Sequence, residues 1–67
     1  MRYTLITATI SDRYSKWCEC YISKNILTRN EATMKMMNLV DNFNAEQKEG
    51  KPLRSLVSVD IKYPYEI

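Results

Sequence analysis

The sequence predicts an α+β domain in which three strands and one helix follow each other in the order ββαβ. Two runs of alternating apolar and polar residues come first, an amphipathic segment with a capping signature follows, and a third alternating run ends the chain. One Gly and two Pro among 67 residues leave few positions for loops. We therefore expect residues 1–67 to form a single domain with most of the chain in regular elements.

The first strand is expected at about residues 2–10, where the run YTLITATI is rich in β-branched side chains. Its alternation gives the strand two faces, made of Thr4, Ile6, Ala8 and Ile10 on one side and Tyr3, Leu5, Thr7 and Thr9 on the other. The polar turn formers SDRYSK then separate it from a second alternating run, WCECYIS. This run predicts a strand at about residues 17–23, so the first two strands form a hairpin.

The helix is expected at about residues 29–49. Thr28 and Glu31 have the spacing of a capping box at its start. At about 100° per residue, one stripe of this segment is apolar and consists of Ala32, Met36, Leu39, Val40 and Phe43. Gly50 suits the left-handed position after the helix, and Pro52 prevents its continuation.

The third strand is expected at about residues 54–63, with Pro64 at its end. Its alternation separates Val57, Val59 and Ile61 from Leu56, Ser58, Asp60 and Lys62. A helix of about 20 residues spans about 30 Å and returns the chain along the sheet. A right-handed crossover then favours a mostly antiparallel sheet of order 2-1-3, and the order 1-2-3 is the alternative.

The helix covers one face of this sheet, and we expect it to cover the face with more aliphatic side chains. The expected sheet residues of the core are Ile6, Ala8, Ile10, Cys18, Cys20, Ile22, Val57, Val59 and Ile61. Free cysteines are often buried, so the CEC pair is interpreted as two reduced core thiols. A structural zinc site needs four ligands, but the chain has no His and no third Cys. We therefore expect no metal and no cofactor.

The other face of the sheet is expected to be uncovered and to carry large side chains. Its candidate partner-binding residues are Trp17, Tyr21, Tyr3, Leu5 and Leu56. Such a patch is typical of an interaction site, so the first hypothesis is a small non-enzymatic module that binds another protein or forms a homodimer. The alternative is that cross-strand pairs only stabilise the sheet. The small size suits a phage or mobile-element protein that inhibits or modulates a host factor.

A second group of polar side chains is expected where the hairpin tip meets the connection after the helix. The candidate nucleic-acid-binding residues there are Arg13, Tyr14, Lys16, Lys51 and Arg54. Binding of single-stranded RNA or DNA, with bases stacked on the aromatic rings and cations on the phosphates, is therefore the alternative function. The interspersed acids favour ordinary solvated loops over this alternative, and the net charge of +2 is too small to argue for nucleic acid.

Catalysis is not expected, because the chain has no His and no catalytic motif. Glu19 and Asp60 would lie about 10 Å apart on the two flanking strands, and they are interpreted as solubilising charges. The first 15 residues contain no apolar run typical of a signal peptide, and no segment has the roughly 20 apolar residues of a membrane span. We therefore expect a cytoplasmic protein that is not bound to a membrane.

Overall fold

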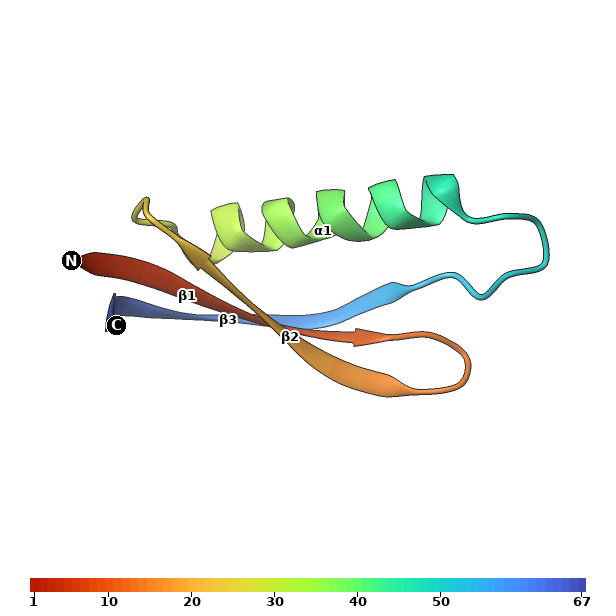
Figure 1. The fold of residues 1–67 in the computed structure, drawn as a ribbon, viewed down its shortest axis with the longest axis horizontal. Coiled ribbons are helices and arrows are strands. Elements are labelled where there is room, and N and C mark those ends of the chain that lie inside the picture. The colour runs from red at the N-terminus through yellow and green to blue at the C-terminus, as the bar shows by residue number, and fades with distance from the viewer.

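Three strands and one helix follow one another in the computed structural model, which describes residues 1–67 (Figure 1). They are β1 (Arg2–Ser11), β2 (Lys16–Ser23), α1 (Arg29–Glu46) and β3 (Ser55–Glu66). The single sheet has the order β2-β1-β3, and β1 pairs antiparallel with both neighbours. The α+β class, the ββαβ order and the strand order 2-1-3 are therefore confirmed, and the order 1-2-3 is wrong.

Asp12 closes the hairpin between β1 and β2. Its carboxylate accepts the backbone N–H groups of Tyr14 and Ser15 at 2.8 and 2.9 Å, and its own N–H donates to Ser15 O at 3.0 Å. The bond from Tyr14, followed by that from Ser15, holds the pKa of Asp12 below its usual value. Aspartate side chains that bond the backbone just ahead of them favour turns. The resulting connection fixes a register in which Ile10 lies opposite Trp17.

α1 begins with the expected capping box. Thr28 Oγ1 accepts the N–H of Glu31, and Glu31 Oε1 accepts the N–H of Thr28, both at 3.1 Å. The helix stops short of the expected end at residue 49, because Gln47 is already extended. Gly50, with φ +85°, serves the connection to β3 instead of the helix end. Glycine adopts this left-handed φ without the strain that a side chain would add.

β3 continues through Pro64, so the expected end of the third strand is wrong. Proline is tolerated there because β3 is an edge strand, where a missing N–H need not break a ladder. The register with β1 shifts twice, near Pro64 and at Val57. The shift at Val57 leaves this residue 51 % exposed and places Leu56 opposite Ile10. Val57 is therefore not the core residue that the alternation predicted, and Leu56 packs against the core instead.

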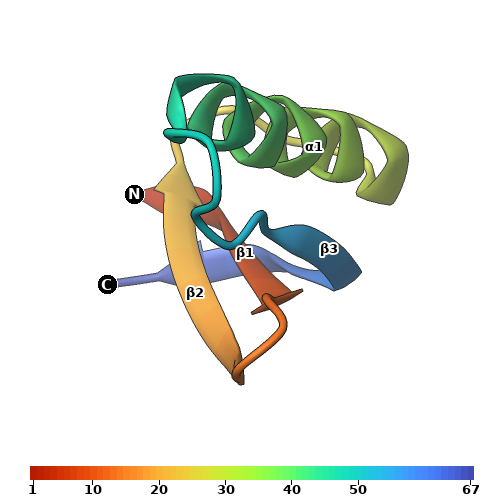
Figure 2. The same ribbon diagram turned by 90° about the vertical axis from the view of Figure 1, so that its right-hand side faces the viewer.

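α1 lies along one face of the sheet and leaves the other face uncovered (Figure 1 and Figure 2). The buried apolar core is small and consists of Ile6, Ala8, Ile10, Ala32, Met36, Val40 and Val59. β2 contributes no residue to it. The molecule is elongated, with extents of 43 × 19 × 19 Å and a radius of gyration of 13.1 Å, against about 11 Å for a compact domain of this length. The helix α1 has 18 residues, and it does not meet the length and hydropathy of a membrane-spanning helix.

Candidate interaction surface

β2 turns its aromatic side chains toward the helix, which is the reverse of the predicted orientation. The register sets three of its residues opposite buried residues of β1, pairing Trp17 with Ile10, Glu19 with Ala8, and Tyr21 with Ile6. Directly opposed residues of an antiparallel pair share a face, and both rings pack against the core. The placement of Trp17, Tyr21 and Leu56 on the uncovered face is therefore wrong. The prediction chose the helix-facing side of β2 by its number of aliphatic side chains. The turn instead sets the register, and the register decides which side chains face the helix.

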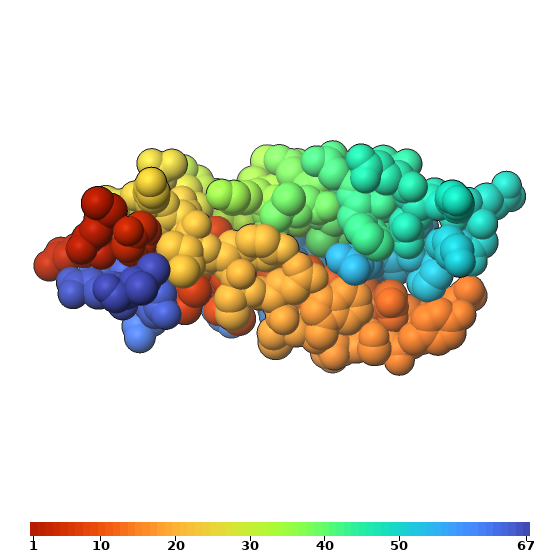
Figure 3. All heavy atoms as spheres, in the orientation of Figure 1, coloured from red at the N-terminus to blue at the C-terminus, as the bar shows by residue number.

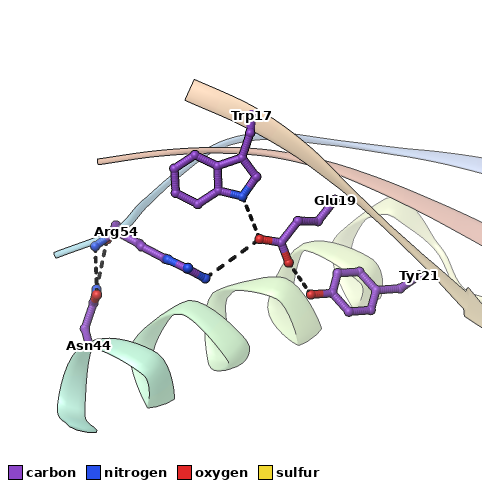
Figure 4. Close-up of polar contacts among 5 residues, drawn as sticks. All are labelled: Trp17, Glu19, Tyr21, Asn44 and Arg54. Atoms are coloured by element: carbon purple, nitrogen blue, oxygen red, sulfur yellow. Dashed lines mark hydrogen bonds and ion pairs between the residues drawn. The ribbon is translucent and has the colours of Figure 1, made fainter. Parts of the chain in front are cut away.

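Glu19 is the centre of a polar cluster on this inner side of β2 (Figure 4). Trp17 Nε1–H donates to its Oε2 at 2.7 Å, and the Tyr21 hydroxyl donates to its Oε1 at 2.5 Å. Arg54 Nη1 lies 3.8 Å from Oε2, and the Glu19 side chain is only 28 % exposed. Glu19 therefore holds two aromatic rings in place, and it is not the solubilising charge that was expected.

These contacts shift the pKa values of both acidic groups. The hydrogen bond from Trp17, then that from Tyr21, and finally the charge of Arg54 hold the pKa of Glu19 below its usual value, while burial opposes them. The bond to the Glu19 carboxylate raises the pKa of Tyr21, with further contributions from burial and from the negative charge. Glu19 is thus a charged acceptor at neutral pH, and Tyr21 is a neutral donor.

Arg54 connects this cluster to α1. Its guanidinium carbon lies 3.7 Å from the ring centre of Phe43 and 5.0 Å from that of Trp17, distances at which a cation is attracted to an aromatic face. The Asn44 side chain accepts the N–H of Arg54 at 2.8 Å and donates to its carbonyl at 2.9 Å. Arg54, which was predicted to contact phosphates, is therefore engaged within the molecule (Figure 4).

The uncovered face of the sheet carries smaller side chains than predicted. Tyr3 and Leu5 lie on it as expected, but the residues that β2 places on this face are Cys18, Cys20 and Ile22. Both cysteines are exposed, and their sulfurs lie 3.6 and 3.9 Å from threonine hydroxyls of β1. Ile22 is 50 % exposed. The expectation that these three residues of β2 belong to the core is therefore wrong.

The two strand carboxylates, Glu19 and Asp60, point to opposite faces of the sheet. Asp60 lies opposite Thr7 on the uncovered face, and it pairs with Arg29 of α1 at 3.3 Å. Groups that act together on one substrate must reach the same reacting atoms. Glu19 and Asp60 therefore do not form a joint site.

The two edges of the sheet differ in how readily they accept another strand. β3 has two register shifts and Pro64, features that protect an edge from pairing. β2 has eight residues, no proline and an unshifted register. Hydrogen-bonded and non-bonded residue pairs alternate along an antiparallel ladder. The pair of Asp12 and Ser15 at the turn is a bonded one, and it fixes which residues of β2 bond to β1. The backbone groups that point away from β1 are those of Lys16, Cys18, Cys20 and Ile22, which we name the β2 edge. It lies across the front of the molecule in Figure 3.

The hairpin tip and the connection after α1 lie at the same end of the molecule, as predicted (Figure 1). Arg13 and Lys51 line one shallow depression there. Tyr14 is exposed, with the Arg13 guanidinium carbon 5.1 Å from its ring centre. Lys16 is exposed at the start of β2. Four of the five predicted nucleic-acid-binding residues thus share this end in exposed positions, and Arg54 is the exception.

A groove of about 470 Å³ separates α1 from the first half of β3. Met37 and Val57, each about half exposed, supply part of its apolar lining, and Asp41 adds a charge. The register shift at Val57 interrupts the strand beside this groove. A regular strand ladder is therefore harder to extend here than at the β2 edge.

Comparison of the chain with protein-family models, with curated proteins and with solved structures found no match. The candidate surface is therefore defined by its geometry. Sequence reasoning missed the stacking of Arg54 on Phe43 and the two bonds from Asn44. It also missed which face of β2 meets the helix. The one signal in the sequence was Asp12, whose side chain fixes the turn and with it the register of β2.

Proposed function

We propose that this protein is a small non-enzymatic module that binds another protein through the β2 edge. The observation that carries the proposal is that β2 is a regular edge strand with no partner on its outer side. Trp17 and Tyr21 are half-buried beside it on the inner side, and Ile22 is half exposed on the other. A strand added to such an edge gains main-chain hydrogen bonds, while side chains on both faces give specificity.

The extent of the exposed surface supports this proposal. The accessible surface is 5060 Å², about 650 Å² more than the roughly 4,400 Å² that general scaling gives for a folded monomer of 7.9 kDa. Each partner in a standard protein interface buries about 800 Å². Tryptophan and tyrosine are also among the residues that most often dominate binding energy, and Trp17 and Tyr21 lie on β2.

A charge placed on the β2 edge tests the proposal. Cys20→Lys adds a lysine to this edge, and Ser58→Lys adds the same charge to the same face of the sheet on β3. Wild type and both variants are immobilised on a resin and incubated with cell lysate. We expect Ser58→Lys to retain the same lysate proteins as the wild type and Cys20→Lys to lose them. Circular dichroism will check that both variants keep the fold. Equal retention by the two variants would contradict the proposal.

Binding of single-stranded nucleic acid is the second candidate function, favoured by the depression that Arg13 and Lys51 share. Stacking of bases on the aromatic rings has less support, because the ring of Trp17 packs against the core and Arg54 lies over it. Oligonucleotide binding that weakens steeply with salt and is lost in Arg13→Ala/Lys51→Ala would favour this candidate over protein binding.

A further inference from the structure

Building on the proposed function, we propose that the strand added to the β2 edge is β2 of a second copy of this chain. The two strands run antiparallel, and Cys20 of one copy lies opposite Cys20 of the other. The result is a continuous six-stranded sheet with the order β3-β1-β2-β2-β1-β3. The surplus exposed surface, the regularity of β2 and its lack of core residues all fit such a pairing.

Two-fold symmetry limits how β2 can pair with itself. A two-fold axis perpendicular to the sheet makes the two strands antiparallel and keeps both helices on the same face. Because opposed residues share a face, the axis must pass beside a residue that lies opposite its own copy. The new hydrogen-bonded pairs form among the residues of the β2 edge, because their N–H and C=O groups point outward. Every residue of β2 satisfies both conditions as a centre, so charge and strand length must decide between the centres.

Charge and strand length select among these centres. Centring on Cys18 or on Tyr21 would pair only five residues of the strand, and centres nearer its ends would pair fewer. Centring on Glu19 would place two carboxylates directly opposite each other, which is destabilising. Centring on Cys20 pairs all of residues 17–23, and Lys16 meets Lys24 only at the exposed ends, where salt screens the repulsion.

The side chains on both faces fit the centre at Cys20. On the uncovered face, Cys18 of one copy lies opposite Ile22 of the other, so compact and apolar groups meet. On the inner face, Glu19 lies opposite Tyr21, and Trp17 lies opposite Ser23. These rings are only half-buried in one copy, and the second copy adds cover along the side where they are open. The pairing also satisfies the free backbone groups of the β2 edge.

The two native cysteines test this register directly. At the centre, the Cα atoms of the two Cys20 residues lie about 5.5 Å apart, within the range of about 4.4–6.8 Å for a disulfide. The two Cys18 residues are displaced by about 13 Å along the strands. Cys18→Ser leaves only Cys20, Cys20→Ser leaves only Cys18, and both thiols are exposed. The variants are therefore matched controls for each other.

Diamide oxidation of the two variants gives the readout. Two thiols form the disulfide and pass two electrons and two protons to diamide, and non-reducing gels follow the covalent dimer over time. We expect Cys18→Ser to cross-link at least about tenfold faster than Cys20→Ser, because only the Cys20 residues have Cα atoms within disulfide range. Equal rates, or faster cross-linking of Cys20→Ser, would overturn the proposed pairing.

Sedimentation of the reduced protein separates this proposal from the proposed function. We expect a wild-type dimer that Cys20→Lys weakens more than Cys18→Lys, since two lysines then lie opposite each other. A wild type that is monomeric at all concentrations would overturn self-pairing. If the wild type is monomeric but captures a partner protein, and Cys20→Lys abolishes this capture, the proposed function stands. Capture that this variant leaves unchanged would remove the proposed function as well.

Discussion

Glu19 accepts hydrogen bonds from Trp17 and Tyr21 and lies beside Arg54, so its negative charge is stabilised in the folded chain. The same contacts hold its pKa below the usual value, about 4.3 in an unfolded chain. A depressed folded pKa contributes stability that is present above the unfolded pKa. This stability is lost as the pH falls through the folded pKa.

We predict that Glu19→Gln lowers the stability at pH 7 by about 1–3 kcal/mol, because hydrogen bonds to a charged group are lost. For a domain of this size, each kcal/mol lowers the Tm by about 4–8 °C, as thermal unfolding will show. The difference from the wild type should shrink toward pH 3. The control Asp60→Asn removes an exposed ion pair and should cost less than about 1 kcal/mol. A pH-independent loss in Glu19→Gln would show that the charge of Glu19 is not the cause.

Single residues differ in how far the sequence predicts their roles. The capping pair Thr28 and Glu31 was predicted correctly, because its contacts span three positions of the chain. The orientation of Glu19 was not, because alternation defines two faces of a strand without saying which one meets the helix. The inner position of Glu19 depends on hydrogen bonds from Trp17 and Tyr21, and on Arg54, which lies far along the chain.

The helix and the third strand are joined by side chains near the C-terminal end of α1. Asn44 binds both backbone groups of Arg54, and Arg54 stacks on Phe43. These contacts hold the start of β3 against the helix. The sequence predicted that both elements exist, but it did not predict their ends, because edge position and register shifts depend on the assembled sheet.

Replacing Asn44 tests this connection. We predict that Asn44→Ala lowers stability by about 1–2 kcal/mol, because two half-buried backbone groups of Arg54 lose their partners. The emission of Trp17 should also shift to the red as Arg54 loosens above its ring. Asn42→Ala, at an exposed position of the same helix, is the matched control and should change stability by less than about 0.5 kcal/mol. Equal losses in the two variants would show that Asn44 does not hold β3.

At the scale of the whole molecule, one edge of the sheet is protected and the other is open. The seven buried apolar residues come from β1, α1 and β3, so β2 depends on its pairing with β1 and on the Glu19 cluster. A domain this small buries a limited fraction of its surface. A second copy at the β2 edge would extend the sheet on the side where the core is thinnest.

Amide hydrogen exchange in β2, followed by NMR in dilute and concentrated protein, tests the pairing of two copies most directly. The amides of Cys18, Cys20 and Ile22 point away from β1, whereas those of Glu19 and Tyr21 point toward it. We predict that the outward amides exchange slowly in concentrated protein and faster on dilution. Fast exchange of these three amides at every concentration, beside protected Glu19 and Tyr21, would contradict the proposed pairing.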